Sequence, residues 1–236
     1  MTLTIDVAPR KIDVLDHGFV RLIDHMGGDE SIVRAARVSY NAAWRAGEDE
    51  GSDARLIRYL WKHQHSSPFE AVEFQFEVKA PIFVLRQWHR HRTWSYNELS
   101  ARYRELPEDF YVPAPDQIGA QSTNTKQARV AAAPDAISPT LIRATCENAF
   151  SAYRALLERG VPRELARSVL PVSTYSHMFA KTNLRNLFHF LTLRCDAHAQ
   201  YEIRVYADAM LSLIRPIAPV AVAAWEGSRR VAPTAM

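Results

Sequence analysis

Guanidinium groups are concentrated in one short stretch of this chain, Arg86 to Arg104, which reads RQWHRHRTWSYNELSARYR. The stretch contains five arginines, two histidines and a single carboxylate, Glu98. Each arginine has five N–H donors that must be paired or solvated, so packing alone does not explain such a density of guanidinium groups. The pattern therefore predicts a binding site for an anionic ligand in this segment.

Glu98, Ser100 and Arg102 are spaced two residues apart, so in an extended segment they share one side. A hydroxyl beside a guanidinium suits a phosphate monoester, and an ionised carboxylate suits a ribose hydroxyl or a paired arginine. A surface salt bridge from Glu98 to a neighbouring arginine, worth about 0 to 1 kcal/mol, is the alternative. Ser100 is not expected to be a nucleophile, because no histidine and carboxylate are arranged to activate it.

His89, Arg90, His91 and Arg92 are consecutive, so on a helix they would point in four directions about 100° apart. They can line one crevice only where the helix ends and the chain turns. The alternative is a solvated basic helix end, where positive charge is favoured by the helix dipole.

A second polar set lies far along the chain. A predicted helix that is otherwise rich in Leu and Phe contains Asn183, Arg185, His189 and Arg194. Arg167 lies on another predicted helix, which is short and largely apolar. An arginine among apolar residues requires a partner, which is either a carboxylate in a structural ion pair or a ligand.

Composition excludes several other classes of site. The eight glycines form neither GxGxxG nor a Walker A motif, and no HExxH or Cys/His cluster predicts a metal. Cys146 and Cys195 are the only cysteines, and Cys146 is expected in the core. A net charge of +3 is too small for a protein that coats nucleic acid. The N-terminus lacks the apolar core of a signal peptide, and the apolar run Ile217 to Trp225 is far shorter than a membrane span, so we expect a cytoplasmic protein without a membrane partner.

Hydrophobic periodicity predicts the elements that position these residues. Residues 72–78 alternate strictly between apolar and polar, which is typical of a strand with one buried face. The other predicted elements of the first half are one or two strands within 11–25, a helix at 31–40, a polar loop at 41–53, a helix capped by Ser52 or Asp53 that ends near His65, and a helix with Pro81 in its first turn.

The second half is predicted to be mostly helical. Residues 116–136 are small and polar and are expected to be a flexible surface loop. The predicted elements that follow are a helix from Ser138 to Gly160, a short helix from Pro162, a strand or irregular piece at 172–179, a helix at 183–195 and a last long helix capped by Asp196. The fold class is therefore α+β, a single domain over 1–236 with helices packed around a small, mainly antiparallel sheet.

Residues 90–103, RHRTWSYNELSARY, resemble the signature of the flavin-dependent thymidylate synthases (the ThyX family), in which R-H-R is followed by seven residues and Ser. These are here Arg90, His91, Arg92 and Ser100. The resemblance continues upstream through HSSPFEAVEFQFEVKAPIFVLRQW and downstream through RELARSVLP and NLRNLFHFLTLRCDAHAQYEI. It covers most of residues 30 to 215.

The resemblance implies a ThyX-like fold and an activity. Members of the family convert dUMP to dTMP, with 5,10-methylenetetrahydrofolate as carbon donor and FAD, reduced by NADPH, as hydride source. They work as homotetramers whose active sites lie between subunits. No protein thiol need attack the pyrimidine, which agrees with two cysteines of core character.

The resemblance also implies which residues bind each ligand. The residues expected at FAD are Ser67, Arg90, His91, Arg92, Glu98, Asn183, Leu184, Arg185 and His189, with weaker matches at Ser39, His65, Glu70, Asn97 and His198. Those expected at dUMP are Gln87, Trp88, His89, Arg90, Glu98, Leu99, Ser100, Ala101, Arg102, Arg167 and Arg194. Arg194 is the expected catalytic residue, because a permanent positive charge can stabilise negative charge that develops near N3 of uracil.

Two positions depart from the family pattern. Ala101 stands where glycine is common, so a positive φ at this residue would strain the loop by about 1 kcal/mol or more. His189 stands where some members have Asn, and both side chains can hydrogen-bond a flavin edge.

A nucleotide- or RNA-binding module without catalysis is the alternative from another class. Its arginines would bind phosphates, and Trp94, Tyr96 and Tyr103 would stack on bases. Against this alternative, Arg167, Arg185 and Arg194 lie in apolar helices where a long strand has poor access.

Overall fold

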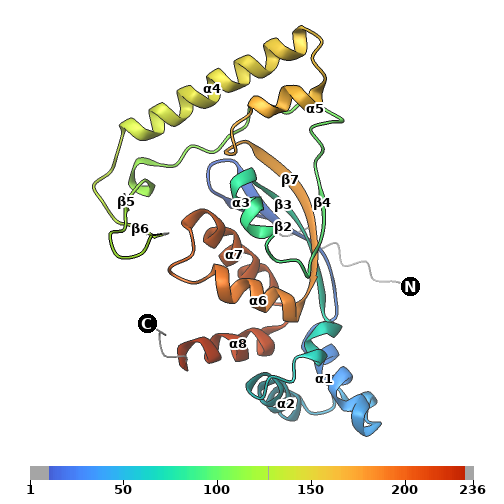
Figure 1. The fold of residues 1–236 in the computed structure, drawn as a ribbon. Coiled ribbons are helices and arrows are strands. Elements are labelled where there is room, and N and C mark those ends of the chain that lie inside the picture. The colour runs from blue at the N-terminus through green and yellow to red at the C-terminus, as the bar shows by residue number, and fades with distance from the viewer. Residues whose placement is uncertain (1–10, 127, 232–236) are drawn as a thin grey trace.

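A five-stranded antiparallel sheet forms the centre of the computed structural model, which describes residues 11–126 and 128–231 (Figure 1). The strand order is β1-β2-β3-β7-β4. The strands are β1 Lys11–Val14, β2 Gly18–Met26, β3 Glu73–Pro81, β4 Ser95–Glu98 and β7 Tyr175–Asn183. The predicted α+β class with a small antiparallel sheet is confirmed.

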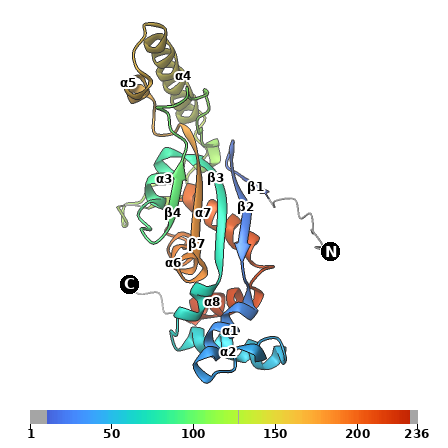
Figure 2. The same ribbon diagram turned by 90° about the vertical axis from the view of Figure 1, so that its right-hand side faces the viewer.

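The alternation in β3 determines which face of the sheet is buried. Phe74, Phe76 and Val78 are at most 1% exposed, whereas the polar residues between them remain partly accessible. The apolar face packs against α3, α6 and α7, and Figure 2 shows the opposite face without a helix in front of it. Ion pairs such as Arg21–Glu77 connect neighbouring strands on that open face.

Eight α-helices surround or extend the sheet within the described residues. They are α1 Asp29–Arg37, α2 Glu50–Lys62, α3 Ile82–Trp88, α4 Ile137–Glu158, α5 Arg163–Ala166, α6 Leu184–Arg194, α7 Tyr201–Ile214 and α8 Pro219–Val231. Single 3-10 turns occur at Val38–Tyr40, Ala43–Arg45, Ser67–Ala71, Pro115–Gln117 and Arg167–Val169. None of the described helices is long and apolar enough to cross a membrane.

Two predicted helix caps are wrong. The cap of α2 is Asp49, whose carboxylate accepts from the N–H of Ser52 at 2.9 Å, and α7 begins after Gln200. Asp53 instead lies inside α2, and Asp196 accepts from the N–H of His198. Several capping-type residues lie close together in both regions, and tertiary contacts decide which of them ends the helix.

Helix α8 was not predicted, because only part of its sequence is apolar. Its Trp225 is 1% exposed and stacks on Phe188 of α6, with ring planes 4° apart. The indole N–H also donates to Thr192 at 2.9 Å. Contacts with distant residues, rather than local periodicity, therefore stabilise this helix.

A second, smaller core lies under α4 and α5, at the end of the molecule away from α8 (Figure 1). It contains Phe110, Cys146, Phe150, Tyr153 and Ala166, which confirms the core position of Cys146. The segment 116–136 leads into α4 and includes a minimal hairpin of β5 Ala120–Gln121 and β6 Arg129–Val130. Its flexibility stays a prediction, as does the single-domain organisation.

Candidate functional site

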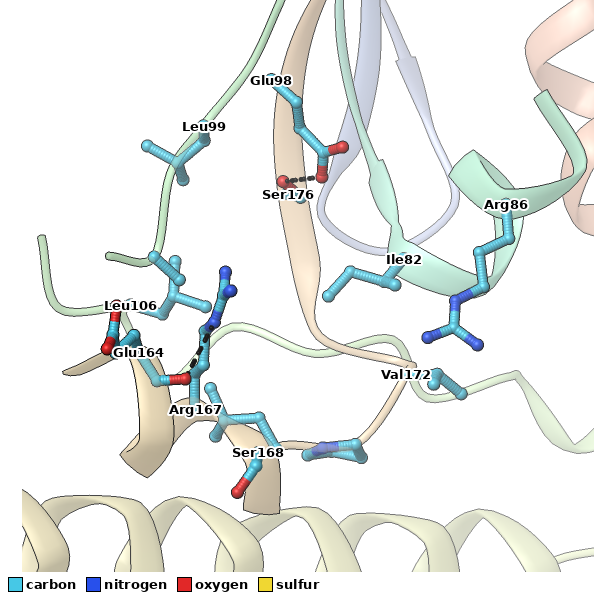
Figure 3. A pocket seen from close by; sticks show the side chains of 13 residues that line it. Ile82, Arg86, Glu98, Leu99, Leu106, Glu164, Arg167, Ser168, Val172 and Ser176 are labelled. Carbon is cyan, nitrogen blue, oxygen red and sulfur yellow. Dashed lines mark hydrogen bonds between the residues drawn. The ribbon is translucent and has the colours of Figure 1, made fainter. Parts of the chain in front are cut away.

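A cavity of about 430 Å³ opens between α3, the end of β4, the α5 segment and the start of β7 (Figure 3). The four predicted site residues that line it are Glu98, Leu99, Ala101 and Arg167. Arg86, which also lines it, belongs to the arginine-rich stretch that predicted an anion site. The residues of the lining that were not predicted are Ile82, Leu106, Glu164, Ser168, Leu170, Pro171, Val172 and Ser176.

Glu98 is the carboxylate of this cavity. It is the last residue of β4 and lies opposite Met178 of β7. The hydroxyl of Ser176, which is 4% exposed, donates to Glu98 Oε1 at 2.7 Å (Figure 3). His89 Nε2 lies 3.9 Å from Glu98 Oε2. The Ser176 hydrogen bond therefore orients one carboxylate oxygen and leaves the other available to a ligand.

The extended conformation that would put Glu98, Ser100 and Arg102 on one side is not observed. The strand ends at Glu98, and the chain turns where the N–H of Tyr103 donates to the carbonyl of Ser100 at 3.1 Å. Arg102 forms an ion pair with Glu164 at 3.1 Å, in which both side chains are more than half exposed. A pair so exposed is weak, so a phosphate can compete for the guanidinium.

Arg86 and Arg167 approach the cavity from opposite sides in Figure 3. Arg167 donates to the carbonyl of Glu164 at 3.3 Å. Arg86, Arg90 and Arg92 are exposed and make no hydrogen bond or ion pair with any residue that the structure describes. Their donors are therefore available for an anionic ligand, as the density of guanidinium groups predicted.

Arg194 is held at the end of α6 by two acceptors. Its Nε donates to His91 Nε2 at 3.1 Å, and its Nη2 donates to the carbonyl of Gln87 at 3.2 Å. Burial, with the positive charges of Arg194 and His189, lowers the pKa of His91 to about 4. His91 is therefore neutral at pH 7 and can accept this hydrogen bond, which fixes the direction of the Arg194 guanidinium.

Two other predicted flavin residues, Asn183 and Arg185, lie at the start of α6. Asn183 caps α6 by accepting from the N–H of Asn186 at 3.0 Å, and Arg185 pairs with Glu70 at 2.9 Å. Asn183 lies five positions along β7 from Met178, the strand partner of Glu98, which is about 17 Å of extended chain. Within one chain, Asn183 thus lies apart from the cavity that Glu98 lines.

Burial determines which predicted residues can present a side chain to a ligand. Trp88 and Leu184 are 0% exposed, so neither presents its side chain to a ligand in this structure. Ala101 is not among the described residues with positive φ, and the expected strain is therefore not present. The predicted residues that are exposed are Ser39, His65, Ser67, Glu70, Arg90, Arg92, Asn97, Glu98, Arg102, Arg167, Arg185, His189 and His198. Gln87, His89, Leu99, Ser100, Asn183 and Arg194 are partly buried.

The cavity has guanidinium groups on two sides and, on a third, a carboxylate that is oriented by a hydrogen bond from Ser176. These are features of a nucleotide-binding α+β protein. The family described as "Thymidylate synthase complementing protein" (Thy1) matches residues 21–220. A flavin-dependent thymidylate synthase of Thermus thermophilus is 51% identical over 218 residues, which cover 92% of this chain and 79% of the relative. That of Treponema pallidum is 47% identical, over 95% of this chain and 74% of the relative.

A solved structure has the same fold. The crystal structure of a UMP/dUMP methylase, PolB from Streptomyces cacaoi, bound with 5-Br dUMP superposes with a TM-score of 0.82. The two sequences are 40% identical, and the match covers 94% of this chain and 100% of that chain. The chain belongs to the family of flavin-dependent thymidylate synthases.

Proposed function

We propose that this protein catalyses the reductive methylation of dUMP to dTMP. In the proposed reaction, 5,10-methylenetetrahydrofolate is the carbon donor and FAD, reduced by NADPH, is the hydride source. Family membership supports the reaction. The single structural observation that carries the proposal is the cavity in which Glu98 lies near two guanidinium groups, those of Arg86 and Arg167.

The chemistry of this cavity matches a pyrimidine nucleotide. Guanidinium groups are donors for a phosphate monoester, and the free oxygen of Glu98 is an acceptor for a sugar hydroxyl or a ring N–H. Arg194 is half-buried, so its charge is screened less than that of an exposed arginine. In the proposed mechanism this charge stabilises the anion that develops on the uracil ring, which makes C5 a better nucleophile.

The residues present fit a flavin with a pyrophosphate. Arg90 and Arg92 have donors without partners among the described residues, and Arg185 is only weakly held by its exposed pair with Glu70. We propose that these arginines hold FAD together with Ser67, Glu98, Asn183, Leu184, His91 and His189. Bound FAD would supply the hydride transfer, and the protein would orient the ligands and exclude water.

We also propose a homotetramer with active sites between subunits. The separation of Asn183 from Glu98, about 17 Å along β7, supports this organisation, because residues of one chain can complete the site of another. Residues such as Tyr40 and Trp44 are large, apolar and more than 70% exposed, which agrees with contacts between subunits. The cytoplasmic location and the absence of a nucleic-acid partner stay predictions.

The visible absorption spectrum of the purified protein tests the proposal. We expect a yellow protein whose flavin is bleached by anaerobic NADPH, and faster bleaching when dUMP is present. Complete assays with methylenetetrahydrofolate should then yield dTMP. UMP is the second substrate to test, because the solved neighbour is described as a UMP/dUMP methylase. A protein that stays colourless with excess FAD would instead favour the non-catalytic binding module.

Replacing Ser176 with alanine is expected to raise the KM for dUMP about 5- to 10-fold, which corresponds to roughly 1 kcal/mol for one hydrogen bond to a carboxylate. The reason is that Glu98 loses the buried donor that orients it. Ser168→Ala is the matched control, because Ser168 lines the same cavity but donates to no described residue. Steady-state kinetics check the prediction, and equal KM values for the two variants would contradict it.

A further inference from the structure

Glu202 is a buried carboxylate that the proposed mechanism does not use. It lies in the first turn of α7 and is 3% exposed. A carboxylate removed from water requires donors, and three reach it from different segments. Glu202 Oε1 accepts from the hydroxyl of Tyr111 and from Arg129 Nη1, both at 3.2 Å, and Glu202 Oε2 accepts from Gln200 Nε2 at 2.8 Å.

The third of these hydrogen bonds connects Glu202 to the predicted pyrimidine site. Gln200 donates to Glu202 with the nitrogen of its amide and accepts with the oxygen from Gln87 Nε2 at 2.5 Å. The amide of Gln200 is therefore fixed at both ends. Gln87 in turn has its side-chain nitrogen occupied and its side-chain oxygen available to a ligand, and its backbone carbonyl accepts from Arg194.

The Arg129 contact connects the same carboxylate to the 116–136 segment. Arg129 is in β6, and its guanidinium also lies over the ring of Tyr201 at 5.7 Å. A second cavity, of about 310 Å³, separates this hairpin from the connection between α6 and α7. The hairpin thus does not pack tightly against α7 here, and the ion pair at 3.2 Å bridges the two elements beside the cavity.

We propose that Glu202 is a positioning residue, which couples the 116–136 segment to dUMP binding. Its charge holds Arg129 on one side and Gln200 on the other, and Gln200 sets the orientation of the Gln87 amide. Breaking the Arg129 contact changes the electrostatic field at Glu202 and the orientation of its carboxylate. This change reaches Gln87 through the side chain of Gln200. The inference rests on the proposed function, because it assigns an effect on dUMP rather than a separate activity.

Steady-state kinetics of three holoenzyme variants test this coupling. The variants are Glu202→Gln, Arg129→Met and Gln200→Ala. We expect each variant to raise the KM for dUMP about 3- to 30-fold, the usual range for residues that act through an intermediary. The flavin spectrum and the rate of flavin reduction without dUMP should not change. Arg129→Lys should recover part of the affinity, since it restores the charge but not the fork of donors. Lys126→Ala is the matched control, because it removes a positive charge from the same segment without touching Glu202.

Three results distinguish the possible failures. If the wild-type enzyme does not turn over dUMP, the proposed function fails and the inference fails with it. If the wild-type enzyme is active and the variants lose thermal stability but keep the wild-type KM, Glu202 has only a structural role and the inference alone is overturned. Should Glu202→Gln not fold, Arg129→Met decides the matter. The Arg129 side chain is 34% exposed in the wild type, so this variant replaces a partly accessible residue. An unchanged KM for dUMP in Arg129→Met overturns the coupling.

Discussion

Replacing Arg194 with alanine is expected to reduce kcat by about 100- to 1000-fold, the usual cost of removing one group that stabilises a developing negative charge. The flavin should stay bound, because in the proposed mechanism Arg194 acts on the pyrimidine and other arginines hold the flavin. The two hydrogen bonds of its guanidinium, to His91 and to the carbonyl of Gln87, fix the charge before substrate arrives. Preorganisation of this kind avoids reorganisation during the reaction. Single-turnover reduction and product analysis measure the effect.

Arg194→Lys separates charge from geometry in this experiment. Lysine keeps the positive charge but cannot donate to His91 and to the carbonyl of Gln87 from a rigid fork. We therefore expect an intermediate kcat for the lysine variant and a flavin spectrum equal to that of the wild type. Full activity of Arg194→Ala would remove Arg194 from the mechanism. Loss of flavin from both variants would instead place the residue at the cofactor.

The sequence predicts well those features that depend on neighbouring residues. The alternation of residues 72–78 predicts β3 because one face of that strand is buried. The density of guanidinium groups predicts an anion site, and the structure places Arg86 and Arg167 at one cavity with Glu98. Gly160 has the positive φ that a residue just past a helix end requires, as expected for α4.

Features that depend on distant pairing could not be predicted in the same way. Ser176 is ordinary in the sequence, and its role arises only because β7 pairs with β4 and brings its hydroxyl to Glu98. Gln200 and Glu202 are likewise explained by donors more than 70 residues away, such as Arg129. The spacing of Glu98, Ser100 and Arg102 would put them on one side of an extended segment, but β4 ends at Glu98 and the chain turns at Ser100.

The predicted flavin residues illustrate a further limit. The sequence places Asn183 in the same list as Glu98, although Asn183 lies five positions along β7 from Met178, the strand partner of Glu98. A short motif can indicate which residues bind the same ligand, but it cannot indicate whether those residues come from one chain or from several. Arg185 pairs with Glu70, and both side chains are more than 40% exposed, so the pair leaves the guanidinium accessible.

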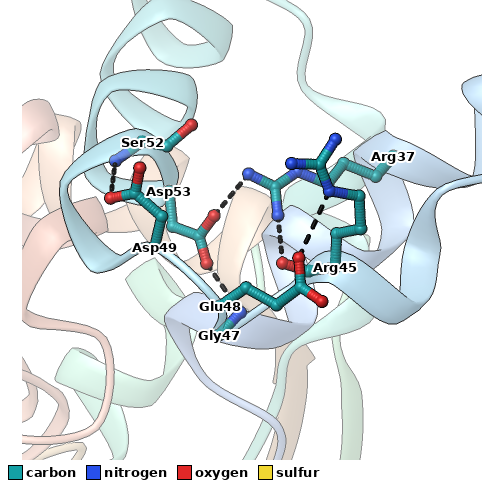
Figure 4. Close-up of polar contacts among 7 residues, drawn as sticks. All are labelled: Arg37, Arg45, Gly47, Glu48, Asp49, Ser52 and Asp53. Atoms are coloured by element: carbon teal, nitrogen blue, oxygen red, sulfur yellow. Dashed lines mark hydrogen bonds and ion pairs between the residues drawn. The ribbon is translucent and has the colours of Figure 1, made fainter.

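Replacing Arg37 with alanine is expected to lower the free energy of unfolding by about 2 to 3 kcal/mol, because it leaves a nearly buried carboxylate without its counterion. Arg37 and Asp53 form an ion pair at 2.5 Å, and their side chains are 17% and 11% exposed (Figure 4). Asp53 also accepts from the N–H of Gly47 at 2.8 Å, and Arg37 donates to the carbonyl of Arg45. The pair therefore connects α1, α2 and the segment between them.

Arg34→Ala is the matched control, because Arg34 lies one turn earlier on α1 and its ion pair with Glu30 is more than half exposed. Its removal should change stability by no more than about 0.5 kcal/mol. In thermal unfolding, Arg37→Ala should lower Tm by about 5 to 10 °C, as expected for a protein of this size. The segment that this pair anchors includes Ser39, a predicted flavin contact, so the flavin content of Arg37→Ala should fall with its stability. A variant that loses stability but keeps full flavin content would show that this segment does not contribute to the cofactor site.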